Sequence, residues 1–317
     1  MEPIDTIRVQ NTLGEGVLWN VETQSLWWSD IQERRLYRYD WKNRSQTVFR
    51  TPERLCSFGF VQDRASLIAA FESGLALYDP ADGTTIWLSR PQAGAAGIRF
   101  NDGRVDRQGR FWAGTMGETQ ARWGQANLYC LDSDGHAHRR ERNIAISNGI
   151  CWSPDGSRFY FADSPKHTIS VYDFDLASGE ISNRRTFVET PEGASPDGAN
   201  VDAEGFLWSA HWGAGRVVRY APDGRIDRVL TVPASQPTCL AFGGPNLDLL
   251  FVTSARDGLR HDQLARQPSA GDVFVYKIGI AGLPDQRYIL NDGRIDPSDA
   301  VRGKTNEGSR TQPKLDT

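Results

Sequence analysis

Four oxygen-bearing side chains occur at matching points of a repeated pattern in this chain. Glu15, Asn101, Asn148 and Asp197 each begin a short, mostly apolar run, in the segments EGVLWN, NDGRVD, NGICWS and DGANVD. Carboxylate and carboxamide oxygens suit calcium, magnesium or manganese and tolerate zinc or iron(II). Two carboxylates buried together also need a cation to offset the cost of their charge. A turn role explains any single Asn-Gly or Asp-Gly pair, but it explains neither Glu15 nor the shared position, so the sequence predicts a divalent-metal site.

The pattern itself has six copies. Phe58 in FGFVQD and Thr238 in TCLAFG hold the same position as the four polar residues, and successive copies lie 41 to 49 residues apart. This period is typical of propeller blades. Each copy continues into aromatic-rich runs such as SLWWSDI and RLYRYD, joined by Asp-Gly or Gly-rich turns, which indicates tight antiparallel hairpins. We therefore predict an all-β fold, a six-bladed β-propeller with four-stranded antiparallel blades whose innermost strands line a central channel.

Both ends of the chain have a distinct character. We predict a single propeller domain over residues 1–291, followed by a polar tail over residues 292–317. The tail has few large apolar side chains to offset its ordering entropy, so we expect a flexible extension. Near the other end, TIRVQN has strand character, and we expect it to supply the outermost strand of the sixth blade and close the ring.

The charge and hydropathy of the chain argue against two classes of binding partner, nucleic acids and membranes. The net charge of −4 provides no basic patch for nucleic acid, and no apolar stretch approaches the length of a membrane span or a signal peptide. We expect no nucleic-acid partner, no membrane partner, a cytoplasmic location, and a monomer or weak homo-oligomer. The four cysteines are far apart with apolar neighbours and are expected to be free core thiols, whereas His211 is expected near the channel mouth.

Several longer segments resemble a known family. LGEGVLW, RFNDGRVDRQGRFWAGTM, ISNGICWSPDG, PDGANVDAEGFLW and FVTSARDG look like blocks of the SMP-30/gluconolactonase/regucalcin-like (LRE-like) family of six-bladed propellers, in content and in order, from about residue 13 to about residue 290. The resemblance implies metal-dependent opening of sugar lactones, with one divalent ion at the channel mouth. It implies metal ligands at Glu15, Asn148 and Asp197, and substrate contacts at Arg99, Asn101 and Glu118.

The reaction expected from these residues is hydrolysis of an aldonolactone, such as glucono-, arabinono-, xylono- or galactonolactone, to the aldonic acid in carbohydrate catabolism. The metal polarises the carbonyl, and Asp197 acts as the general base toward the attacking water. The chain has no G-x-S-x-G motif, which argues against a serine nucleophile.

Three alternatives remain open at this stage. An arylester or phosphotriester hydrolase could use the same site, and a non-enzymatic calcium-binding protein could use the same metal ligands. A strictosidine-synthase-like propeller is disfavoured, because that chemistry relies on a pocket glutamate without a metal.

Overall fold

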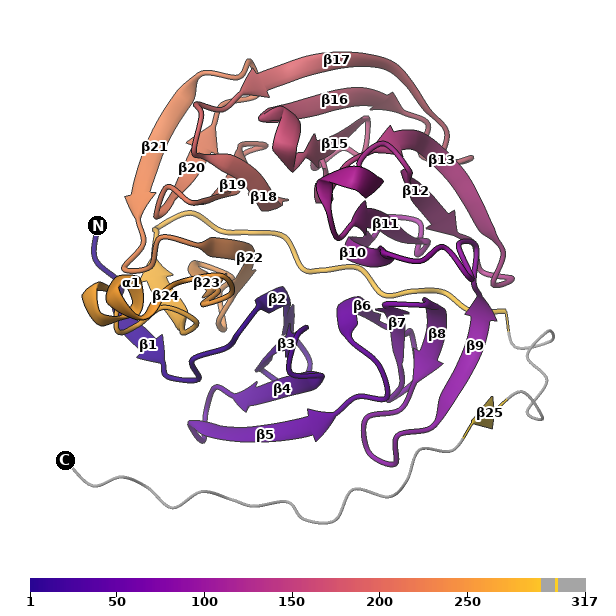
Figure 1. Cartoon of the computed structure of the whole chain (residues 1–317), viewed down its shortest axis with the longest axis horizontal. Helices are drawn as coiled ribbons and strands as arrows, with labels where there is room; N and C mark the ends of the chain where they lie inside the picture. Colours follow the sequence, from indigo (N-terminus) through magenta and orange to yellow (C-terminus); the bar gives the residue numbers. More distant parts are fainter. Residues whose placement is uncertain (292–299, 302–317) are drawn as a thin grey trace.

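The chain folds into a ring of six antiparallel β-sheets around a central axis (Figure 1). The computed structural model describes residues 1–291 and 300–301. In five blades, four strands follow one another in sequential order from the axis outward, and in the sixth the outermost strand comes from the N-terminal segment, which confirms the predicted propeller. The sheet of the second blade has a fifth strand at its outer edge. The first three blades comprise β2 (Gly14–Asn20), β3 (Ser25–Asp30), β4 (Arg35–Asp40) and β5 (Ser45–Arg50); β6 (Leu55–Phe60), β7 (Leu67–Phe71), β8 (Gly74–Tyr78) and β9 (Thr85–Ser89); and β10 (Ile98–Val105), β11 (Phe111–Gly117), β12 (Ala126–Leu131) and β13 (Ala137–Ile144).

The other three blades complete the ring. They comprise β14 (Ser147–Trp152), β15 (Arg158–Asp163), β16 (Thr168–Phe174) and β17 (Ile181–Glu189); β18 (Ser195–Val201), β19 (Leu207–Trp212), β20 (Arg216–Tyr220) and β21 (Ile226–Thr231); and β22 (Pro237–Gly243), β23 (Leu249–Ser254), β24 (Val273–Lys277) and β1 (Asp5–Ile7). Strand β1 is antiparallel to β24, with Thr6 opposite Phe274. This pairing confirms that the N-terminal segment closes the ring.

Burial follows the distance from the axis. Every residue of β2, β6 and β14 is buried, whereas most residues of the outermost strands β5 and β17 are exposed. Aromatic pairs join neighbouring blades: Trp19 stacks on Phe251, and Trp112 meets Trp152 edge-on at 5.9 Å between ring centroids. Such pairs contribute beyond their buried area, so the tryptophans help to hold adjacent blades together.

A recurring aspartate stabilises the turn that follows an innermost strand. In VDRQGRFW, the carboxylate of Asp106 accepts hydrogen bonds from the backbone N–H groups of Gln108 and Arg110 and from the indole of Trp112. Asp202 makes the same three types of bond in VDAEGFLW. One side chain thus satisfies the turn and anchors the next strand, which explains why this block recurs in the sequence.

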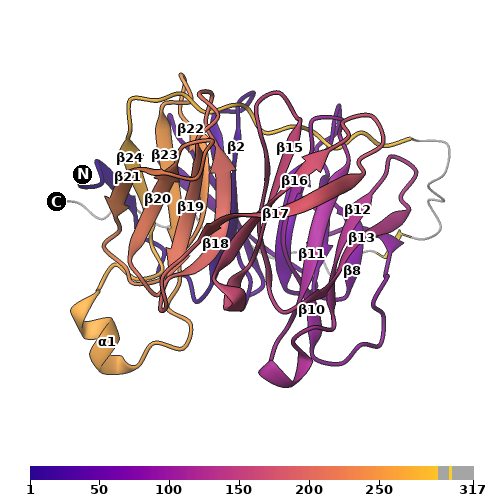
Figure 2. The same cartoon turned by 90° about the horizontal axis from the view of Figure 1, so that it is seen from above.

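The two ends of the ring carry different connections. Two 3-10 helices, η1 (Gln120–Arg122) and η2 (Ser164–Lys166), and the helix α1 (His261–Arg266) lie at one end (Figure 2). Residues 278–291, here called the strap, cross the other end above the axis (Figures 1 and 2). The strap is tied to blades on opposite sides of the ring: the carbonyl of Ala281 accepts from the backbone N–H of Ala203 on the fifth blade, and the backbone N–H of Tyr288 donates to the carbonyl of Phe60 on the second. Between them, Asp285 pairs with Arg104 at 3.1 Å.

Other predictions concern the cysteines, the tail and the membrane. All four cysteines are free and buried, as expected. In the described part of the tail, β25 (Ala300–Val301) pairs with β9; the remaining predicted tail, residues 292–299 and 302–317, lies outside the described residues. Among the helices described, none has the length and apolar character of a membrane span.

Candidate active site

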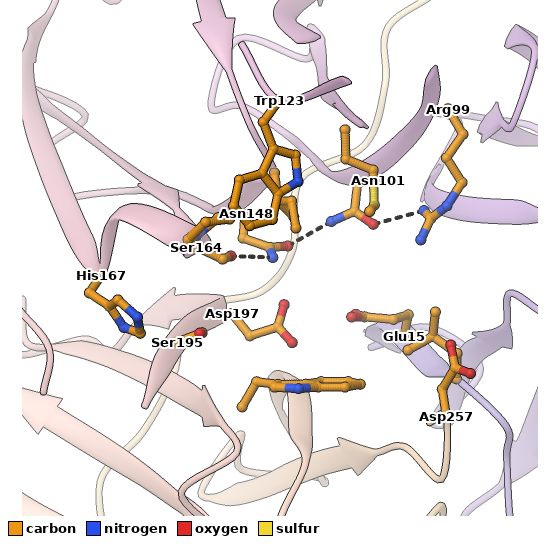
Figure 3. A pocket seen from close by; sticks show the side chains of 15 residues that line it. Glu15, Arg99, Asn101, Trp123, Asn148, Ser164, His167, Ser195, Asp197 and Asp257 are labelled. Carbon is orange, nitrogen blue, oxygen red and sulfur yellow. Dashed lines mark hydrogen bonds between the residues drawn. The ribbon is translucent and has the colours of Figure 1, made fainter. Parts of the chain in front are cut away.

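A cavity of about 460 Å³ opens at the end of the ring where the innermost strands begin. Its volume falls in the range of about 300–1,000 Å³ that is usual for small-molecule sites. Five of the predicted site residues line it, from four different blades: Glu15 on β2, Arg99 and Asn101 on β10, Asn148 on β14 and Asp197 on β18. In Figure 3 the carboxylates of Glu15 and Asp197 face each other across the cavity.

The register of these residues differs by one position between two pairs of strands. Glu15 and Asn148 are the last paired residues before a β-bulge, whereas Asn101 and Asp197 are the first residues inside one. Glu15 and Asn148 are each followed by a glycine with positive φ, and the bulge at this glycine changes the direction of the strand. The Asn148-Gly149 pair is therefore a bulge within an innermost strand rather than a hairpin turn.

The two apolar or small members of the six-copy pattern do not line the cavity. Phe58 is buried in a hydrophobic cluster between the first two blades. Thr238 is fully buried, and its hydroxyl bonds to the carbonyl of Gly14 and to Thr253. These positions support the ring, so the polar residues that the pattern contributes to the cavity come from four of the six blades.

Burial dominates the electrostatics of the carboxylates. Desolvation, followed by the nearby Asp102 carboxylate, raises the pKa of Glu15 to about 8. Desolvation, followed by the charges of Glu15 and Asp102, also raises the pKa of Asp197 well above its usual value. Arg99 opposes these shifts only weakly. Burial thus disfavours ionisation of both carboxyl groups, and additional positive charge in the cavity would favour it.

A chain of hydrogen bonds orients the amides in the cavity (Figure 3). Arg99 Nη1 donates to Asn101 Oδ1 at 2.8 Å, and Asn101 Nδ2 donates to Asn148 Oδ1 at 3.0 Å. Asn148 Nδ2 in turn donates to Ser164 Oγ at 2.8 Å. The oxygens of Asn101 and Asn148 thus each accept one hydrogen bond, and each keeps a second lone pair for a further partner.

Glu118, the sixth predicted site residue, lies beside the cavity rather than on its wall. It lines a neighbouring hollow of about 380 Å³ that shares Arg99 with the main cavity. Arg54 Nη1 donates to Glu118 Oε1 at 2.7 Å, and Arg99 Nε lies 3.9 Å from the same oxygen. Arg54 also pairs with Glu72, so Glu118 is held within a network of two arginines and two glutamates.

Comparison with known proteins identifies the family. The model of the SMP-30/gluconolactonase/LRE-like region matches residues 13–256, which include all of these cavity residues except Asp257. The chain belongs to the SMP-30/gluconolactonase/LRE-like family. This result confirms the resemblance seen in the sequence blocks.

The chain is similar to several named proteins. The chain is 36% identical over 284 residues to a 6-deoxy-6-sulfogluconolactonase of Pseudomonas putida, covering 89% of this chain and 97% of that protein. It is 40% identical over 285 residues to an L-arabinolactonase of Azospirillum brasilense, covering 88% and 93%. The structure of a calcium-binding protein, regucalcin, from Agrobacterium tumefaciens superposes with a TM-score of 0.87 at 32% identity, covering 92% of this chain and 99% of that one.

The SMP-30/gluconolactonase/LRE-like site of this chain has a donor set that suits a divalent cation. Glu15 and Asp197 present buried carboxylates that have too little positive charge near them, and Asn148 presents an amide oxygen. An all-oxygen set of this kind fits a hard cation. Glu15, Asn148 and Asp197 could hold the ion, and the Asn101 oxygen, which accepts one bond from Arg99, keeps a second lone pair in the same cavity.

His211, a candidate for the channel mouth, does not line the cavity. Its side chain is fully buried, accepts from Arg216 Nε, and lies 3.2 Å from the Tyr220 hydroxyl. Burial lowers the pKa of this imidazole to about 4. Its neighbour Trp212 lines the cavity instead, because successive side chains of a strand point to opposite faces.

Other cavity residues had no assigned role in the sequence. Trp123 follows η1 and lies beside Asn148 in the view of Figure 3, and His167, Ser195 and Asp257 complete parts of the wall. Trp123, His167 and Asp257 lie in connections whose paths depend on packing between blades, whereas Ser195 begins β18. The acidic residue Asp102 is recoverable from sequence, because it directly follows Asn101 in the recurring block.

Proposed function

We propose that this protein hydrolyses a sugar lactone to the aldonic acid, with a divalent cation held by Glu15, Asn148 and Asp197. The observation that carries the proposal is the pair of buried, facing carboxylates at the base of a cavity that also exposes Arg99 and Asn101. The lactonase names of the relatives from Pseudomonas putida and Azospirillum brasilense support the same reaction. The ion is calcium, zinc, manganese, magnesium or iron(II), each of which accepts this ligand chemistry.

A cation held by these residues would supply Lewis-acid polarisation of the lactone carbonyl and a lower pKa for water in the site. Asp197 serves as the general base, taking a proton from the attacking water as the water oxygen bonds to the carbonyl carbon. The ring C–O bond breaks, and the proton passes from Asp197 to the departing ring oxygen.

Arg99, Asn101 and Glu118 are proposed to bind the hydroxyl groups of the substrate. A guanidinium, an amide and a carboxylate together supply donors and acceptors that reject analogues without the matching hydroxyl. Glu118 reaches the substrate from the neighbouring hollow, next to Arg99.

An arylester or phosphotriester hydrolase is a second candidate for the same site. It is favoured by the apolar parts of the cavity wall, which include Leu13, Met116, Trp123, Ile146 and Trp212. An aromatic leaving group would bury its ring against such a wall. A calcium-binding protein without catalysis is the remaining alternative, in line with the description of the regucalcin from Agrobacterium tumefaciens.

The test is a panel assay on metal-stripped protein. Each of the five ions is added back, and acid release is followed on aldonolactones, aryl esters and a phosphotriester. Turnover of a lactone that requires an ion and disappears in Asp197→Asn supports the proposal; Asp223→Asn, at an exposed turn, is the matched control. Turnover of the esters alone selects the second candidate, and binding of an ion without any turnover selects the calcium-binding alternative.

A further inference from the structure

Ser164 connects the two strands that carry Asn148 and Asp197. It is the first residue of η2, directly after β15, and its side chain is buried while lining the cavity. Its hydroxyl makes two hydrogen bonds. It accepts from Asn148 Nδ2 at 2.8 Å and donates to the carbonyl of Pro196 at 2.7 Å, and Pro196 directly precedes Asp197.

The chemical types at the two ends of this hydrogen-bond chain fix its direction. A guanidinium can only donate, so Arg99 forces the oxygen of Asn101 toward itself. A backbone carbonyl can only accept, so Pro196 forces the hydroxyl of Ser164 to donate to it. Every amide and hydroxyl between these ends then has one consistent orientation.

This direction determines which end of the Asn148 side chain is available to a ligand. The amide nitrogen is occupied by Ser164, and the amide oxygen accepts one bond from Asn101. The second lone pair of that oxygen remains for a cation. If the amide rotated by half a turn, it would present a positively polarised NH2 group to the ion and could not ligate it.

We propose that Ser164 is a positioning residue for the cation site: it locks the Asn148 amide with the oxygen toward the ion and ties the Asn148 strand to the backbone just before Asp197. The inference rests on the cation site of the proposed function, but not on the reaction. Partners of this kind, which orient a ligand without touching the metal, typically change metal affinity by about 10–100-fold.

The experiment measures cation affinity directly. Mn²⁺ and Ca²⁺ are titrated calorimetrically into metal-stripped wild type, Ser164→Ala, Ser164→Thr and Ser170→Ala. Ser170 is the matched control, because it is a buried serine of the same blade whose hydroxyl accepts from Arg184 instead. Thermal unfolding with chelator reports the stability of each metal-free variant.

The expected result is a cation affinity weakened about 10–100-fold in Ser164→Ala, largely restored in Ser164→Thr and unchanged in Ser170→Ala. At saturating cation, the KM of Ser164→Ala for its substrate should change less than its cation Kd. A purely structural role would instead lower the unfolding temperature of metal-free Ser164→Ala and leave the cation Kd at the wild-type value, which overturns the inference.

Two further results separate this inference from the proposed function. Wild type that binds none of the five ions of the panel assay overturns both. Wild type that binds an ion but hydrolyses no lactone removes the proposed reaction, and the role of Ser164 is then decided by the cation Kd values alone. If Ser164→Thr binds as weakly as Ser164→Ala, the hydroxyl is not the group that matters and the inference is wrong.

Discussion

Replacing Glu15 with glutamine should stabilise the metal-free protein at alkaline pH. The carboxylate is buried opposite Asp197, and burial together with Asp102 raises its pKa from 4.5 to about 8. Between these two pH values the folded state holds a proton that the unfolded state has lost. The free energy of unfolding of metal-free wild type therefore falls as the pH rises through this window.

The size of the effect follows from the pKa shift. At about 1.36 kcal/mol per pKa unit, a change from 4.5 to about 8 is worth on the order of 5 kcal/mol. Glutamine cannot ionise, and its amide oxygen can keep the hydrogen bond from the backbone N–H of Gly16. Glu15→Gln also removes a like charge next to Asp197, so the pKa of that carboxyl should move down.

The assay is thermal unfolding in chelator at several pH values between 5 and 8.5. Near pH 5 wild type and Glu15→Gln should unfold at similar temperatures. At pH 8 the variant should unfold higher by on the order of 10 °C, taking about 2 °C per kcal/mol for a chain of this size. Excess Ca²⁺ or Mn²⁺ should raise the wild-type midpoint and leave the variant unchanged.

The control is Glu192→Gln, which changes an exposed glutamate outside the cavity. Its pH profile should follow that of wild type. Profiles of wild type and Glu15→Gln that run parallel from pH 5 to pH 8.5 would refute the argument, because they would show that Glu15 carries no excess proton in the folded state.

Three further predictions follow from other contacts. Cation affinity should rise with pH up to about 8, since binding must release the proton held by Glu15; calorimetry in buffers of different ionisation enthalpy counts the protons released. Deletion of residues 1–8 removes β1 from the edge of β24 and should lower the unfolding temperature sharply, whereas activity of the remaining folded fraction should persist. Asp285→Ala should cost about 3–5 kcal/mol in chemical denaturation, because it leaves the Arg104 guanidinium buried without its partner, and Arg104→Met in the same chain should recover much of that loss.

The fold was predictable because its signal is repeated. Six copies at a nearly constant period, each with strand-like runs and Asp-Gly turns, are consistent with few architectures other than a propeller. The strand character of TIRVQN was also sufficient to predict ring closure, since an open propeller leaves one blade a strand short.

The residues of the site could be predicted from the sequence only in part. The limit is the exact position of each residue along its innermost strand, which the repeat does not reveal. The bulges place Glu15 and Asn148 one position earlier than Asn101 and Asp197, and a period of 41 to 49 residues cannot resolve a single position. A shift of one residue turns a side chain to the other face of its strand. The sequence therefore could not decide between His211 and its neighbour Trp212, and it is Trp212 that lines the cavity.

Glu118 illustrates a different limit. Its position depends on Arg54, which lies 64 residues earlier in the chain, and on Glu72, which holds Arg54 in turn. Ion pairs between neighbouring blades join residues far apart in the chain and leave no pattern in a single sequence. The same is true of Ser164, whose importance becomes visible only when β14 and β18 are side by side.

The strap has a consequence for how substrate reaches the cavity and how product leaves it. Residues 278–291 cross the end of the axis opposite the cavity, and Asp285 meets the buried guanidinium of Arg104 there. The strap thus lies over the axis at that end, whereas the cavity is lined by Trp123 at the other. We therefore expect substrate and product to pass through the same opening, so that the acid leaves before the next molecule enters.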